Sequence, residues 1–133
     1  EDPALVAAGL THDIADAVYR GHAEHEHRGA ALVEPLLGAR VARLVGYHVL
    51  AKRYLVTTDA DYRSRLSDRS AATLRAQGDI LDEAACMQLE HDADFEAIVA
   101  LRRADERAKD PFAEVPDLEA WRPLLQRLSS SAK

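Results

Sequence analysis

Apolar residues recur at three- and four-residue spacing along most of the 133-residue chain. This spacing places them on one face of an α-helix, whereas the alternation of apolar and polar residues that marks a β-strand is nearly absent. The pattern predicts an all-α protein, folded as a compact helical bundle.

The boundaries of the helices are predicted from residues that commonly begin or end them. Pro3 can occupy a first helical turn and Gly38 can follow a last one, while Asp82 and Asp94 can cap the helices after them. We expect helices at about residues 4–17, 25–37, 41–56, 67–77, 82–90, 94–109 and 118–128, a loop at 57–62 and a frayed tail at 129–133.

Length and composition favour one domain over residues 1–133, because the chain has the usual size of a single domain. No apolar run approaches the roughly 20 residues that cross a bilayer. The lone Cys86 cannot form an internal disulfide and fits a reducing compartment. A net charge of −6 argues against nucleic acid as a partner. We therefore expect a cytoplasmic protein that binds neither membrane nor nucleic acid, and its oligomeric state stays open.

The first residues, Glu1-Asp2-Pro3, include no initiator methionine and lack the basic-then-apolar order of a signal peptide. We expect further residues before Glu1, including a helix.

Histidine and aspartate recur where they could bind metal, because imidazole nitrogens and carboxylates are ligands of borderline and hard ions. His12 and Asp13 are adjacent in an apolar predicted helix, where the carboxylate could bridge two ions. The pair could equally lie on a helix surface without function. His25 follows at a predicted helix start, although it, His22 and His27 could also be solvated loop residues.

His48 lies in the long predicted helix at 41–56, on one side with Val41, Leu44, Val45 and Lys52. Since Lys52 follows one turn later, it could offer its ammonium group to an anionic substrate held on a metal. The alternative is a hydrogen-bonded core histidine beside a lysine whose charged end reaches solvent.

Arg102 and Asp105 are three residues apart and share a face of the helix predicted at 94–109. The carboxylate could complete a metal site, and the guanidinium could make paired bonds with phosphonate oxygens. The alternative is a surface helix with salt bridges, which accounts for Arg103, Glu106 and Arg107.

A neutral polar stripe at spacing i, i+3 and i+7 could hydrogen-bond a phosphonate or another polar group, although most such stripes face water. It consists of Ser70, Thr73 and Gln77.

Five segments of the chain resemble the HD-domain mixed-valence di-iron oxygenases of phosphonate catabolism. They are Leu-Thr-His-Asp-Ile at 10–14, His-Glu and Gly-Ala within 25–30, His-Val-Leu-Ala-Lys-Arg-Tyr-Leu at 48–55, Leu-Ser at 66–67 with Thr-Leu-Arg-Ala-Gln-Gly at 73–78, and Leu-Arg-Arg-Ala-Asp at 101–105.

The resemblance implies an HD-domain bundle that holds two iron ions as an Fe(II)/Fe(III) pair and uses O2 as co-substrate. In this reading Asp13 bridges the two ions. The implied iron ligands are His12, Asp13, His25, His48 and Asp105. The implied substrate-binding residues are Lys52, Ser70, Thr73, Gln77 and Arg102.

The chain also departs from the family pattern. Family members carry a further iron-ligating histidine on an earlier helix, and often a second histidine where this chain has Asp16. The stretch that follows His12 is shorter than usual, so we expect omitted loop residues between Ile14 and Glu24.

Two replacements next to family motifs leave the identity of the substrate open. Ala104 stands in place of an aromatic residue, and Asp79 stands in place of a glycine.

By resemblance, the expected reaction is cleavage of the carbon–phosphorus bond of a small 1-hydroxyphosphonate with O2. Its products would be phosphate and a carboxylate such as glycine. Two other functions stay open: an HD-type phosphohydrolase, since such metal sites also activate water, and a non-catalytic binding domain if the metal site is incomplete.

Overall fold

The computed structural model describes residues 2–20 and 24–133, and the described residues form helices and no strand. The predicted all-α class is therefore confirmed. His22 and part of the expected omission between Ile14 and Glu24 lie outside the described residues.

The helices of the described residues are α1 (Pro3–Thr11), α2 (Ile14–Val18), α3 (His25–Leu37), α4 (Ala39–Thr58), α5 (Ala60–Arg65), α6 (Asp68–Leu74), α7 (Glu83–Glu90), α8 (Phe95–Arg107), the 3-10 helix η1 (Leu118–Trp121) and α9 (Arg122–Ser131). None of them combines the length and the apolar surface that a transmembrane segment needs.

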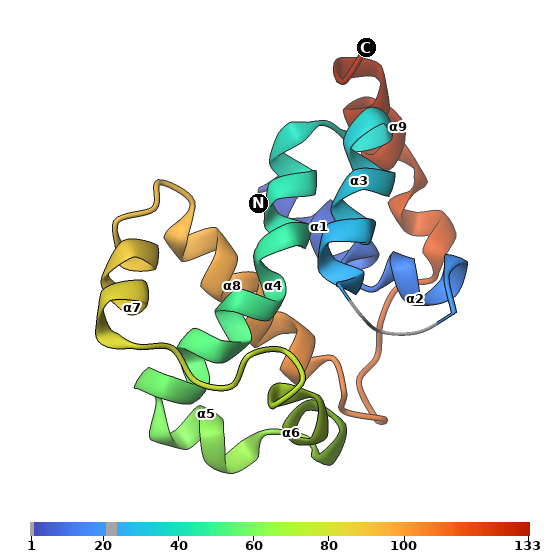
Figure 1. The fold of residues 1–133 in the computed structure, drawn as a ribbon. Helices are drawn as coiled ribbons and strands as arrows, with labels where there is room; N and C mark the ends of the chain where they lie inside the picture. The colour runs from blue at the N-terminus through green and yellow to red at the C-terminus, as the bar shows by residue number, and fades with distance from the viewer. Residues whose placement is uncertain (1, 21–23) are drawn as a thin grey trace.

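Helix α4 runs through the middle of the molecule, and α1, α3 and α8 pack along it (Figure 1). Its buried face begins with Val41, Leu44 and Val45 and continues without interruption to His48 and Lys52. The stripe predicted from the sequence is therefore the buried face of α4. Because the buried face is polar at His48 and Lys52 and apolar again at Leu55 and Val56, the core leads directly into a polar interior along the middle of α4.

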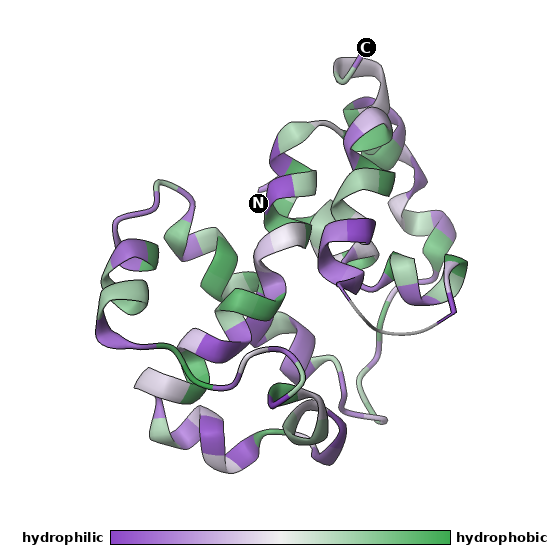
Figure 2. Cartoon of the chain, viewed as in Figure 1, coloured by the Kyte–Doolittle hydropathy of each residue, from purple (hydrophilic) through white to green (hydrophobic). Residues whose placement is uncertain are grey.

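Helix α8 repeats this arrangement. Ile98 and Leu101 are fully buried in the core, and Arg102 and Asp105 follow on the same face. Figure 2 shows the hydrophobic residues of α8 where it lies next to α4, whereas the short helix α5 at the bottom of the view is mostly hydrophilic.

Several predicted boundaries are confirmed by local contacts. Helix α3 has the predicted bounds, and Asp82 and Ser67 accept hydrogen bonds from Ala85 N and Ser70 N at the starts of α7 and α6.

Four predicted boundaries are wrong. Residues 57–62 are not a loop, because α4 continues to Thr58 and Asp59 caps α5 by accepting from Tyr62 N. Helix α6 ends at Leu74 rather than near Gln77, and residues 129–131 extend α9 instead of fraying. The predicted helix at 4–17 is two helices, with His12 and Asp13 between them.

Replacing Ile98 by alanine should lower the free energy of unfolding by about 2–5 kcal/mol, because the side chain is 0% exposed and its removal leaves a cavity between α4 and α8. Denaturant unfolding monitored by circular dichroism measures this loss. The matched control is Leu118→Ala, since Leu118 is 71% exposed and should change the stability by less than about 0.5 kcal/mol. Equal losses in the two variants would contradict this placement of the core.

Candidate metal centre

The break between α1 and α2 turns His12 and Asp13 toward the same place. The ring N–H at His12 Nδ1 donates to the carbonyl oxygen of Gly9 over 2.9 Å, so the ring satisfies a carbonyl that the end of α1 leaves without a helical partner. In a continuous helix the two side chains would diverge by about 100°. The break therefore brings together two groups that one helix would separate.

His48 is fixed in the same tautomer by its own helix. Its Nδ1–H donates to the carbonyl oxygen of Val45 over 2.6 Å, which leaves the lone pair on Nε2. Burial lowers the pKa of His48 to about 4, with the nearby rings of His12 and His25 acting in the same direction. His48 is therefore neutral at pH 7, which is the form that binds metals.

His25 begins α3 and directs Nε2 at Nε2 of His48, 3.0 Å away. Both side chains are buried. Two ring nitrogens at this distance need either one proton or a shared cation between them, since two lone pairs would repel each other.

The carboxylate of Asp13 lies between two groups of ligands. Its Oδ1 is 3.6 Å from His25 Nε2 and 3.7 Å from His48 Nε2, while its Oδ2 is 3.5 Å from His12 Nε2. One potential ligand atom from each of Asp13, His25 and His48 lies within 4.8 Å of the others. These three residues could hold a metal ion.

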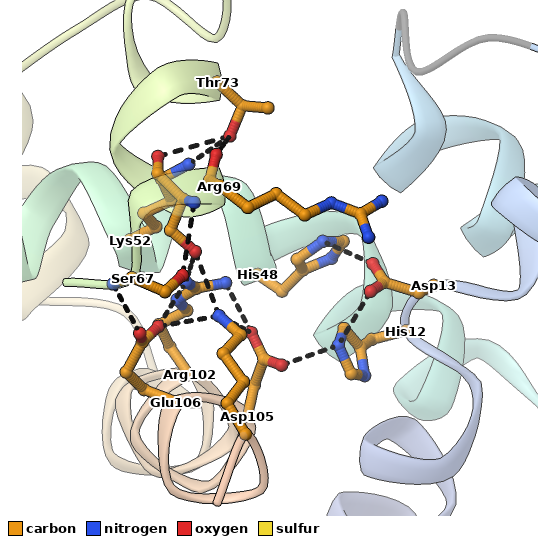
Figure 3. Close-up of polar contacts among 12 residues, drawn as sticks. His12, Asp13, His48, Lys52, Ser67, Arg69, Thr73, Arg102, Asp105 and Glu106 are labelled. Carbon is orange, nitrogen blue, oxygen red and sulfur yellow. Dashed lines mark hydrogen bonds and ion pairs between the residues drawn. The ribbon is translucent and has the colours of Figure 1, made fainter. Parts of the chain in front are cut away.

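On the other side of His12, Asp105 Oδ1 lies 3.3 Å from Nε2 (Figure 3). Burial alone would raise the pKa of Asp105, but the contact with His12 and the charge of Arg102 hold this pKa well below its usual value. His12 Nε2 is buried and has no hydrogen-bond partner among the described residues. A lone pair facing a carboxylate is stable only with a proton or a cation between them, so the donor set fits a metal ion.

Lys52 lies one turn beyond His48 and is only 2% exposed. Its ammonium group donates to Thr73 Oγ1 over 2.8 Å and to Gln77 Oε1 over 2.7 Å. Burial, together with the charges of Arg102 and Lys109, lowers the pKa of Lys52 to about 8. An ammonium has three N–H groups, so the two hydrogen bonds leave one for a ligand.

Arg102 is 5% exposed, and four of its five N–H groups have partners within the protein. Nε donates to the hydroxyl of Tyr62, Nη1 donates to Asp105 Oδ2, and Nη2 donates to both Ser70 Oγ and Glu106 Oε2. The guanidinium therefore holds Asp105 in position and is not free for paired bonds to a ligand.

These groups surround one small cavity of about 120 Å³. A dry cavity of about 150 Å³ holds a molecule the size of benzene, so a ligand of similar size fits. Figure 3 shows histidines and Asp13 on one side of this region and Lys52, Arg102 and Glu106 on the other. The lining residues are Asp13, Asp16, His25, His48, Val49, Lys52, Arg69, Ser70, Thr73, Gln77, Arg102, Asp105 and Lys109.

Nine of the ten residues singled out from the sequence line this cavity, and His12 lies next to it, against Asp13 and Asp105. The assignment of Glu106 to a solvated surface is wrong, because Glu106 is mostly buried and accepts from Arg102, Lys109 and Ser67 N.

Sequence reasoning missed four lining residues: Asp16, Val49, Arg69 and Lys109. Lys109 lies four residues after Asp105, so helical spacing could have predicted that the two side chains share a face. No pattern connected Arg69 with Asp16, which lie on different helices with Arg69 Nη2 and Asp16 Oδ2 3.7 Å apart.

Fold and site together define an all-helical protein with a histidine–aspartate group suited to metal, next to a cavity lined by cations. The sequence is similar to two curated phosphonate dioxygenases. It is 36% identical over 104 residues to 1-hydroxy-2-(trimethylamino)ethylphosphonate dioxygenase (glycine-betaine-forming) of Leisingera caerulea, covering 78% of this chain. It is 33% identical over 126 residues to hydroxymethylphosphonate dioxygenase of Gimesia maris, covering 87% of this chain.

The chain spans 53% and 63% of the length of these two relatives. It is also 32% identical over 94 residues to an uncharacterised protein of Acanthamoeba polyphaga mimivirus. The matched segment covers 71% of this chain and 43% of that protein. No family model matches the sequence, so the HD domain stays a prediction. The resemblance to phosphonate dioxygenases is confirmed by the two named relatives.

Replacing His48 by alanine should weaken metal binding by at least about 100-fold, because it removes a preorganised neutral ligand at the centre of the group. Metal analysis of the purified protein measures this loss. In the wild type, chelation should also lower the melting temperature, since the ligands converge only in the folded chain.

The matched control is His91→Ala. His91 is exposed at the end of α7, and its ring Nδ1–H donates to the carbonyl oxygen of Met87, one turn earlier. Unchanged metal content in His48→Ala, or an equal loss in His91→Ala, would refute the candidate centre.

Proposed function

We propose that this protein is an iron-dependent oxygenase that cleaves the carbon–phosphorus bond of a small 1-hydroxyphosphonate with O2. The observation that carries the proposal is the meeting of the histidine–aspartate group and the buried cations at one small cavity. The names of the two related dioxygenases support the same class of substrate.

Two metal ions, rather than one, are supported by the position of Asp13. Each of its oxygens faces a different group of histidines, as expected of a carboxylate that bridges two ions. We assign His12, Asp13 and Asp105 to one iron, and His25, His48 and Asp13 to the other.

Atom balance defines the overall reaction. R–CH(OH)–PO3H2 and O2 give R–COOH and H3PO4, so the C–P bond and one C–H bond break and both oxygen atoms of O2 enter the products. An iron pair, when bound, would supply the activation of O2 and the electron transfer that this oxidation requires.

The protein contributes binding and orientation of the substrate. The remaining N–H of Lys52 and the amide N–H groups of Gln77 are donors suited to phosphonate oxygens, and Thr73 holds the ammonium of Lys52 in place. Arg102 acts as a positioning residue, because its bonds fix Asp105 and Ser70. The reacting carbon then lies between the phosphonate and the metal side of the cavity.

Iron-loaded protein should consume O2 when a 1-hydroxyphosphonate is added, and phosphate should appear in equal amount. An oxygen electrode combined with a phosphate assay measures both. Asp13→Ala is the inactive control, since loss of the proposed bridge should remove both irons and all turnover. Phosphate release without O2 consumption would instead identify a phosphohydrolase, and the absence of both iron and turnover in the wild type would identify a binding domain.

Lys52→Met should raise KM by about tenfold or more while leaving the iron content unchanged, because it removes a buried charge that faces the anion. Steady-state kinetics and metal analysis distinguish the two effects. Arg75→Met is the control. Arg75 lies between Thr73 and Gln77 in the sequence, but its side chain is exposed and does not line the cavity.

The pH profile of the wild type tests the same residue. With its pKa lowered to about 8, Lys52 in the free enzyme is charged below this pH and becomes neutral above it. Therefore kcat/KM should fall as the pH rises through about 8. A profile in which Lys52→Met keeps this same alkaline limb would remove Lys52 from the assignment.

A further inference from the structure

Lys109 follows the end of α8 and directs its ammonium group back into the cavity. The sequence pattern alone predicted no role for this residue. Its Nζ donates to Ser70 Oγ over 2.9 Å and to Glu106 Oε2 over 2.8 Å, and lies 3.8 Å from Asp105 Oδ2. The side chain of Lys109 is 36% exposed, so its ammonium group reaches the buried hydroxyl of Ser70 from the solvent side of the cavity.

The charges around this end of the cavity do not balance. Among the described residues at this end, Lys52, Arg102 and Lys109 are positive, and Asp105 and Glu106 are negative. Arg102 is held between the two carboxylates, and Lys52 donates to neutral side chains. The oxygen of Asp105 that faces His12 also belongs to the proposed metal site. Three cations and two carboxylates leave an excess of one positive charge. This excess approaches two charges if the proposed metal site takes up the charge of Asp105.

The hydroxyl of Ser70 connects the two outer cations. Its oxygen accepts from Arg102 Nη2 over 3.1 Å and from Lys109 Nζ over 2.9 Å. Because both lone pairs of the oxygen are then used, the hydroxyl hydrogen is left to be donated. Lys109 thus orients a neutral donor as well as bringing its own charge.

We propose that Lys109 is a specificity-determining residue, whose charge makes this site prefer a doubly charged tetrahedral group such as a phosphonate over a singly charged one such as a sulfonate. The inference rests on the proposed function, which places the phosphonate at this end of the cavity. A dianion matches the positive excess, whereas a monoanion leaves part of it uncompensated in a partly buried site.

The test compares methylphosphonate with methanesulfonate, two similar anions that differ in charge and lack the hydroxyl group needed for turnover. Isothermal titration calorimetry on iron-loaded protein without O2 gives both affinities. At pH 7, where Lys52 is still charged and the positive site favours the doubly charged form of the phosphonate, the wild type should bind methylphosphonate at least about tenfold more tightly than methanesulfonate.

Lys109→Met keeps the length of the side chain but removes its charge, so it should weaken methylphosphonate binding by about tenfold and methanesulfonate binding by less than about threefold. Lys109→Arg should restore most of the preference. The matched control is Arg107→Met, because Arg107 is an exposed cation at the same end of α8 that lines a separate groove.

An equal loss for the two anions in Lys109→Met, or no loss, would overturn the assignment. A wild type without preference would overturn it too, even if the variants fail to fold. Since neither anion is turned over, failure of the oxygenase reaction with hydroxyphosphonates is a separate result: it would reject the proposed function and leave a measured preference of Lys109 intact.

Discussion

The structure depends on a single buried face of α4 that carries two polar side chains, His48 and Lys52, between apolar residues toward either end. Val41, Leu44 and Val45 anchor the helix in the core, and the same face then presents His48 and Lys52. Because four residues of a helix advance about 6 Å, the packing that holds the core also sets the distance between the ring proposed to bind metal and the ammonium group proposed to bind an anion. Helix α8 follows the same order, from Ile98 to Asp105.

Burying Lys52 and Arg102 opposes folding, because each charge leaves water for a less polar interior. The network around them offsets this cost through hydrogen bonds to neutral side chains together with the ion pairs of Arg102 with Asp105 and Glu106. Tyr62 and Ser70 accept from Arg102, and Thr73 accepts from Lys52. Such buried cations with shifted pKa values are common at functional sites, where stability is given up for chemistry.

The sequence was sufficient for the all-α class, the long central helix and nine of the cavity-lining residues, because period and spacing are local properties of the chain. It could not show that α1 ends before His12, since this break depends on a ring N–H that replaces a backbone donor at Gly9. It also could not show that Arg102 is occupied, because its partners Tyr62 and Ser70 come from α5 and α6. Contacts between distant segments decide which polar residues act on a ligand and which only support one.

The cations at the cavity contrast with the charge of the whole chain, which is −6. An anion approaching from solution first meets net repulsion and is attracted near the cations that line the cavity. Salt screens interactions between exposed charges beyond about 8–10 Å but affects partly buried pairs much less. Added salt should therefore remove more of the long-range repulsion than of the local attraction, so that an anion enters this cavity more readily at physiological ionic strength than in dilute buffer. Proteins that capture anions with a broad basic surface behave in the opposite way.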